Sequence, residues 1–432
     1  MTDLQLQALR HGMDTQMPHH LRAVTCPPSR TLHRTSPMTD TRTLCEGEVV
    51  IRLNDNVPVP RPCKGEVLVR VRAASINPGD WKVQSGLIPF LPRRFPATAG
   101  YDLAGNVVAV GPGVTKYTVG EAVFGKAPFF KMGALAQYAI LEAARSARKP
   151  SSLTFESAAA LPVGLTALEA VRDGAGLLLP ASLEEPKQGC ESPQKPSAER
   201  SPDCSGKGEN SSNGTVSGAS SSRNDSSGKR ARVLVANASG GVGHMAVQLA
   251  KAAGAHVTAT VGARNLAFAR NVLGADKVLD YNSPAGKQLY PSSSSSPPPV
   301  SSLSAPTAAQ VASSSHPPIT GLYDAVVDCS PTSLAVSAVD RVLRPQGRWV
   351  HVELPLSLLA LGLWRSLALR PRKLHPVMMA NREGDLEVLG RMAEGGKVRV
   401  VVESSVPFEE AREAWRRSMG GHVTGKVVVR ME

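Results

Sequence analysis

The sequence predicts an α/β protein in which a β-rich domain precedes a doubly wound parallel sheet. The first observation is a series of short strand-like segments within residues 45–165, separated by glycine and proline turns. The second is an alternation of apolar strands with apolar-faced helices from residue 231 onward, which is typical of parallel sheets. The 432 residues are enough for two domains, each with its own core.

Three stretches lack the pattern of a folded domain. Residues 1–44 are rich in Arg, His and Thr and show no apolar periodicity, so we expect a disordered or targeting tail. Residues 181–230 and 291–318 are dominated by Ser, Pro and Gly. Such segments bury too little apolar surface to offset their ordering entropy, and we expect two disordered inserts.

The β-rich part begins with residues 66–72, where apolar and charged residues alternate as in a half-buried strand. Residues 107–110 and 122–124 predict further strands, and the Gly-Pro-Gly sequence at 111–113 predicts a turn between them.

The second part contains five short strand candidates with a helix after the first. The helix is indicated by apolar residues on one face between Val242 and Ala253. The strand candidates are residues 232–236, 256–260, 277–280, 324–328 and 348–352.

Composition narrows the function. The net charge is +13, but no basic run is interleaved with aromatic residues, so we do not expect nucleic-acid binding. No apolar run reaches the length of a membrane-spanning helix, and the six cysteines show no metal-binding spacing.

A glycine-rich turn is the strongest chemical signal. It lies between an apolar strand and an apolar-faced helix, the context in which backbone N–H groups and a helix N-terminus bind a pyrophosphate. We therefore expect a dinucleotide to contact Ser239, Gly240, Gly241, Val242 and Gly243.

The second strand indicates which dinucleotide. NAD-binding folds place an acidic residue about 20 residues after the glycines, whereas here residues 260–265 contain none. Gly262, Arg264 and Asn265 occupy this region, and Arg264 is suited to the 2′-phosphate of NADPH. Tyr281 is expected to flank the same pocket. The alternative for Arg264 is a solvated surface arginine, and the alternative for Tyr281 is an ordinary half-buried tyrosine.

Several stretches resemble the zinc-free quinone oxidoreductase branch of the medium-chain dehydrogenase/reductase superfamily, most closely its chloroplast-envelope members in plants. These stretches are residues 76–82, 161–167, 239–251, 257–265, 273–281 and 422–426. The resemblance implies a GroES-like catalytic domain at 45–165, completed by about 375–432, and a Rossmann domain at 166–374. Asn237 departs from the small alanine that this family usually has there.

The resemblance also implies NADPH-dependent hydride transfer to a quinone or to the C=C bond of an α,β-unsaturated carbonyl. Zinc enzymes of the superfamily carry Gly-His-Glu where residues 100–105 read Gly-Tyr-Asp-Leu-Ala-Gly, so we expect no metal. Lys82 is the catalytic candidate, and Asn77 and Thr166 are expected to line the cofactor site. Asp80 fits a local turn or ion pair, His244 fits a packed or solvent-facing histidine, and His351 and Glu353 are expected to line the cleft.

Other functions are compatible with this sequence. A non-catalytic NADPH sensor, a membrane-associated scaffold or an enoyl reductase acting on acyl thioesters would share this fold. A homodimer and peripheral membrane attachment through residues 354–377 are also considered. The resemblance favours a chloroplast location, with the cytoplasm next.

Overall fold

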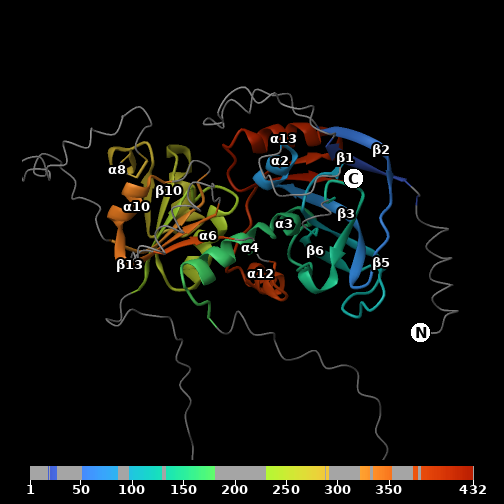
Figure 1. The fold of residues 1–432 in the computed structure, drawn as a ribbon, viewed down its shortest axis with the longest axis horizontal. Helices are drawn as coiled ribbons and strands as arrows, with labels where there is room; N and C mark the ends of the chain where they lie inside the picture. The colour runs from blue at the N-terminus through green and yellow to red at the C-terminus, as the bar shows by residue number, and fades with distance from the viewer. Residues whose placement is uncertain are drawn as a thin grey trace, which may run out of the picture.

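The structure is a computed structural model with two β-sheet domains (Figure 1). It describes residues 18, 20–26, 51–85, 97–128, 133–180, 230–287, 289–290, 322–330, 334–352, 373–377 and 381–431. The expected inserts, apart from Arg230, and most of the expected tail lie outside these residues.

The catalytic domain contains a seven-stranded sheet in the order β15-β16-β3-β5-β6-β8, with β7 paired to β3. Its pairings are antiparallel except between β15 and β16. The strands are β3 (Glu66–Ile76), β5 (Asp102–Val110), β6 (Ala122–Lys126), β7 (Tyr138–Glu142), β8 (Ser146–Arg148), β15 (Val402–Pro407) and β16 (Lys426–Arg430). The C-terminal strands thus complete the domain that the N-terminal half begins.

A smaller antiparallel sheet in the order β2-β1-β4 lies in the same domain. Its strands are β1 (His20–Cys26), β2 (Arg52–Pro58) and β4 (Ala97–Thr98). The expectation of a disordered tail is therefore wrong for residues 20–26. Leu21, Ala23 and Val24 are at most 2% exposed, because β1 packs beside residues 135–137.

The Rossmann domain is a six-stranded parallel sheet in the order β11-β10-β9-β12-β13-β14. The strands are β9 (Arg232–Ala236), β10 (His256–Val261), β11 (Lys277–Asp280), β12 (Tyr323–Asp328), β13 (Leu343–His351) and β14 (Lys373–Pro376). Central strands such as Val233–Ala236 are buried throughout, as expected for a sheet covered on both faces. The predicted fold class, a GroES-like β domain with a Rossmann-type sheet, is confirmed.

Helices connect the two sheets and cover them. They are α2 (Pro78–Ser85), α3 (Phe155–Ala160), α4 (Val163–Leu168), α6 (Gly243–Ala252), α7 (Leu266–Asn271), α8 (Pro284–Lys287), α10 (Val336–Val342), α12 (Asp385–Glu394) and α13 (Ala411–Met419). The short 3-10 helices are η1 (Ala143–Arg145), η3 (Ala263–Asn265) and η5 (Phe408–Glu410), and η2 (Glu169–Gly174) is a π-helix. Figure 1 shows α3 and α4 at the centre of the molecule, between the two sheets. One apolar cluster continues from Phe124 of the catalytic domain to Val350 of the Rossmann domain, so the domains share a core.

Candidate active site between the domains

The glycine turn lies at the carboxyl end of β9, where α6 begins. Gly243 opens this ten-residue helix, and the amide of Gly240 donates to the carbonyl of Asn237 over 3.1 Å. A Cβ atom on Gly243 would lie 2.2 Å from that same carbonyl oxygen, so no side chain fits there. The predicted Ser239, Gly240, Gly241, Val242 and Gly243 therefore form a tight strand-to-helix turn of the kind that binds a pyrophosphate.

Asn237 suits the backbone conformation at the start of the turn. Its φ angle is +53°, in the left-handed region that Asn tolerates better than most side chains. Its Nδ2 atom donates to the carbonyl of Cys329 over 3.0 Å, which ties the turn to the loop after β12. The side chain thus stabilises the strained backbone that starts the turn.

The residues predicted to bind the ribose end of the cofactor lie close together after β10. A Cβ atom on Gly262 would lie 2.8 Å from the hydroxyl of Tyr281, so these two residues are neighbours, as the sequence suggested. Arg264 is exposed on η3 and donates to the carbonyl of His422, and the Oδ1 atom of Asn265 accepts from Thr424 over 3.2 Å.

Residues 422–426 of the catalytic domain contact both groups. The amide of Gly425 donates to the carbonyl of Ser239 over 2.8 Å. A Cβ atom on Gly241 would lie 3.2 Å from Cδ of Lys426. Residues 422 and 424 lie more than 150 positions from their partners Arg264 and Asn265, so no local sequence pattern indicates this contact.

A buried polar cluster lies on the catalytic side. The Lys426 ammonium donates to Oδ1 of Asn77 over 2.5 Å, and Nδ2 of Asn77 donates to Asp102 over 2.8 Å. The backbone N–H of Asn77 donates to the Asp80 carboxylate over 2.7 Å. Burial raises the pKa of Asp80 to about 7, and the neighbouring Asp102 charge raises it too. Burial lowers the pKa of Lys426, against the attraction of both carboxylates.

Three further residues were singled out in the sequence: Lys82, Thr166 and Asp80. Lys82 is half-buried on α2, with its ammonium 5.5 Å from the centre of the Trp81 ring. Thr166 is buried on α4, the helix that packs against α6. Asp80 lies in the first turn of α2 rather than in a separate loop turn, and its carboxylate is fully buried within the cluster.

His244 is a packed structural residue. Its ring is fully buried, with Nδ1 3.0 Å from the Gly240 carbonyl, while Nε2 accepts from the amide of Val401 over 3.3 Å. Burial lowers its pKa to about 4, so the ring is neutral at physiological pH. His351 is also buried, 3.6 Å from Asp328, and Glu353 lies outside the described residues.

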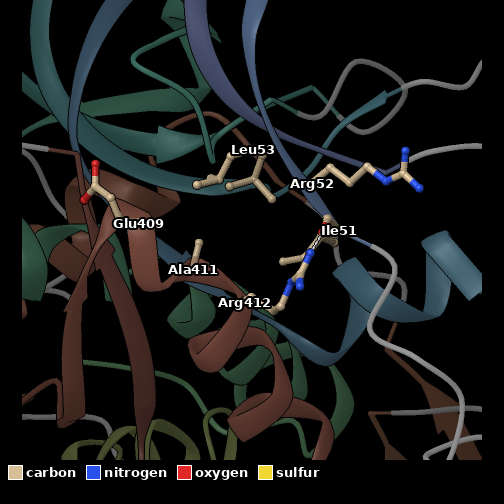
Figure 2. Close-up of a pocket in the computed structure, with 7 residues that line it drawn as sticks. Ile51, Arg52, Leu53, Glu409, Ala411 and Arg412 are labelled. Carbon is tan, nitrogen blue, oxygen red and sulfur yellow. Dashed lines mark hydrogen bonds between the residues drawn. The ribbon is translucent and has the colours of Figure 1, made fainter.

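A cavity of about 500 Å³ lies elsewhere in the catalytic domain (Figure 2). It is lined by Val24, Ile51, Arg52, Leu53, Glu409, Ala411 and Arg412. Figure 2 shows Arg412 directed at the backbone of Ile51, whose carbonyl it contacts over 3.1 Å. The cavity includes none of the predicted site residues, so the glycine turn and the polar cluster remain the candidate site.

Neither a metal cluster nor a membrane span is found within the described ranges. No group of three or more His, Cys, Asp or Glu side chains there is placed to hold a metal ion. No helix in the same ranges is long and apolar enough to cross a membrane.

Comparison with known proteins decides the family. Residues 63–151 match a family described as alcohol dehydrogenase GroES-like domain, and residues 308–429 match one described as zinc-binding dehydrogenase. The chloroplast envelope quinone oxidoreductase homolog of Arabidopsis thaliana is 34% identical over 375 residues, covering 86% of this chain and 92% of that protein. The chain belongs to the quinone oxidoreductase-like branch of the medium-chain dehydrogenase/reductase superfamily.

Two further relatives bear on fold and cofactor. The quinone oxidoreductase from Coxiella burnetii has the same fold, with a TM-score of 0.64 and 24% identity, covering 96% of this chain and all of that one. The mitochondrial NAD(P)H oxidoreductase RTN4IP1 of Mus musculus is 27% identical over 417 residues, 88% of this chain and 85% of that protein. The family is one of NAD(P)H-dependent oxidoreductases. By its name the Arabidopsis relative belongs to the chloroplast envelope, and the mouse relative is mitochondrial.

Proposed function

We propose that this protein is an NADPH-dependent reductase of a quinone or an α,β-unsaturated carbonyl, and that it works without zinc. The observation that carries the proposal is the contact between the glycine turn and the buried polar cluster through residues 422–426. The turn provides the pyrophosphate site, and the cluster lies on the other side of the same interdomain contact. Relatives named quinone oxidoreductases support the reaction class.

The residues fit a bound dinucleotide. Gly243 admits no side chain, and the glycines at 240, 241 and 243 let the backbone of the turn come close to a pyrophosphate. Arg264 is exposed on η3, just after β10, and residues 260–265 contain no carboxylate to contact a ribose hydroxyl. These features favour NADPH over NADH.

When bound, NADPH supplies a hydride to the substrate carbon. The chain contributes orientation and charge. Donors near the substrate oxygen stabilise the negative charge that develops there, and Lys82 on α2 and the Asn77 amide are the candidates for this role. Thr166 on α4 is expected to line the nicotinamide end.

A substrate panel tests the proposal. Purified full-length protein is mixed with NADPH and a quinone, a free enone or an enoyl thioester, and the loss of NADPH absorbance is followed. We expect turnover with quinones or free enones to exceed turnover with the thioester. NADPH binding without consumption on every substrate would instead indicate a sensor or scaffold.

A chloroplast location is proposed on the basis of the Arabidopsis relative. Because another relative is mitochondrial, the mitochondrion is the main alternative location. A fluorescent fusion of the full chain in plant cells distinguishes them.

A further inference from the structure

Lys426 connects the two halves of the candidate site. It is the first residue of β16 and directly follows Gly425, whose amide bonds to Ser239 in the glycine turn. Its stem lies against Gly241, where an added Cβ atom would be 3.2 Å from Cδ. The side chain therefore extends from the cofactor turn into the catalytic domain.

The Lys426 ammonium fixes the orientation of the Asn77 side chain. It is 3% exposed and donates to the Ile76 carbonyl over 2.7 Å and to Oδ1 of Asn77 over 2.5 Å. An ammonium can only donate and the Asp102 carboxylate can only accept, so the Asn77 amide has one satisfactory orientation. Its Nδ2 atom must face Asp102, as observed at 2.8 Å.

The surrounding charges explain why a cation is needed there. Asp80 and Asp102 are buried together, and one oxygen of each, Oδ1, has no hydrogen-bond partner among the described residues. Lys126 is a second cation that interacts electrostatically with Asp80 and Lys426. The neutral His244 interacts with the Lys426 charge, and Tyr101 interacts with the Asp80 charge. Two buried carboxylates without compensation are strongly unfavourable, and Lys426 supplies charge at the centre of the cluster.

We propose that Lys426 is a positioning residue for the reduction, holding the Asn77 amide and balancing the Asp80–Asp102 charge so that the catalytic domain stays in register with the cofactor turn. This role rests on the proposed function. Lys426 would act on the reaction indirectly, through Asn77 and the glycine turn.

The test compares Lys426→Met with the matched control Lys251→Met. Methionine keeps the stem but removes the ammonium, whereas Lys251 forms a surface ion pair with Asp276. We expect kcat of Lys426→Met to fall about 10- to 100-fold, because misplacing a group near the reacting atoms costs that much. The Kd for NADPH should stay within about threefold of wild type, since each factor of ten requires about 1.4 kcal/mol of lost contacts.

A second readout does not depend on turnover. Removing the cation removes one influence that lowers the pKa of Asp80, so the infrared band of a protonated buried carboxyl should titrate at higher pH in Lys426→Met than in wild type. The same band should vanish in Asp80→Asn, which assigns it. An unchanged titration in Lys426→Met would overturn the charge-balancing role, even if no substrate were turned over by wild type.

A double variant covers the case in which Lys426→Met does not fold. Asp80→Asn/Lys426→Met removes one charge of each sign and leaves no extra uncompensated carboxylate. We expect it to fold and still to show the loss of kcat, because Asn77 has lost its donor. Wild-type kcat in this folded double variant, or in Lys426→Met itself, would overturn the proposal.

Discussion

The backbone amide of Gly425 donates a hydrogen bond to the carbonyl oxygen of Ser239 over 2.8 Å. Gly425 precedes the strand that completes the catalytic sheet, whereas Ser239 belongs to the turn that we expect to bind the pyrophosphate. The domains are therefore joined at the site itself. Changes in the turn should consequently affect cofactor binding and the packing of the two domains together.

Replacing Gly243 by Ala should damage this turn. The added Cβ atom would lie 2.2 Å from the Asn237 carbonyl oxygen, so backbone must move, which costs about 1–3 kcal/mol as overpacking does. Urea unfolding and NADPH titration would show lower stability and weaker binding. Gly390→Ala on α12 is the control, since its Cβ atom would meet ordinary contacts of 3.5 Å or more. Equal behaviour of the two variants would contradict the assigned geometry.

Arg264→Ala should reduce the preference for NADPH. Hydrogen bonds to a charged phosphate contribute about 1.5–3 kcal/mol, so the ratio of kcat/KM for NADPH to that for NADH should fall about 10- to 100-fold. Arg270→Ala on the neighbouring helix α7 removes an exposed arginine outside the site and serves as control. Equal efficiency of wild type with both cofactors would rule out this reading of Arg264.

Acid sensitivity should depend in part on His244. Its pKa is lowered by burial from an ordinary 6.5 to about 4, so the unfolded chain binds a proton at higher pH than the folded chain. The stabilising contribution is present above pH 6.5 and is lost as pH falls toward 4, by roughly 3 kcal/mol at about 1.36 kcal/mol for each pH unit. Urea midpoints between pH 7 and 4 should vary less in His244→Gln than in wild type. If His244→Gln keeps the wild-type dependence of stability on pH, the buried ring of His244 does not account for the acid sensitivity.

The N-terminal strand should be required for stability. Leu21 and Val24 are buried in β1, and burying a Leu or Val side chain stabilises by about 1.5–3 kcal/mol each. A chain that starts at Met38 lacks β1 and should melt at a lower temperature, whereas one that starts at Met17 should match wild type. If the Met38 chain melted like the full chain, β1 would not belong to the stable fold.

Activity should be independent of zinc. Residues 100–105 supply neither His nor Glu at the position where zinc enzymes of this superfamily have ligands. Incubation with a chelator is expected to leave turnover unchanged, and elemental analysis should find no stoichiometric zinc. One zinc per chain, lost together with activity, would contradict this expectation.

Local sequence determined much of the fold. The strands predicted at 66–72, 232–236 and 324–328 follow from alternating or continuous apolar residues, and the structure has strands at 66–76, 232–236 and 323–328. The glycines between residues 240 and 243 mark a strand-to-helix turn. Each of these signals depends on neighbours within a few residues. Residues 20–26 were missed because a short, partly polar strand becomes recognisable only through its partners at 52–58 and 97–98.

Tertiary structure alone decided how the site is assembled. The sequence indicated Asn77 and the glycine turn separately, but it could not show that Lys426 contacts both. Lys426 and Asn77 are 349 positions apart, and their contact forms only when β16 pairs with β3 in the catalytic sheet. Such long-range contacts depend on the register of sheets and the packing of domains, which no local pattern of residues specifies.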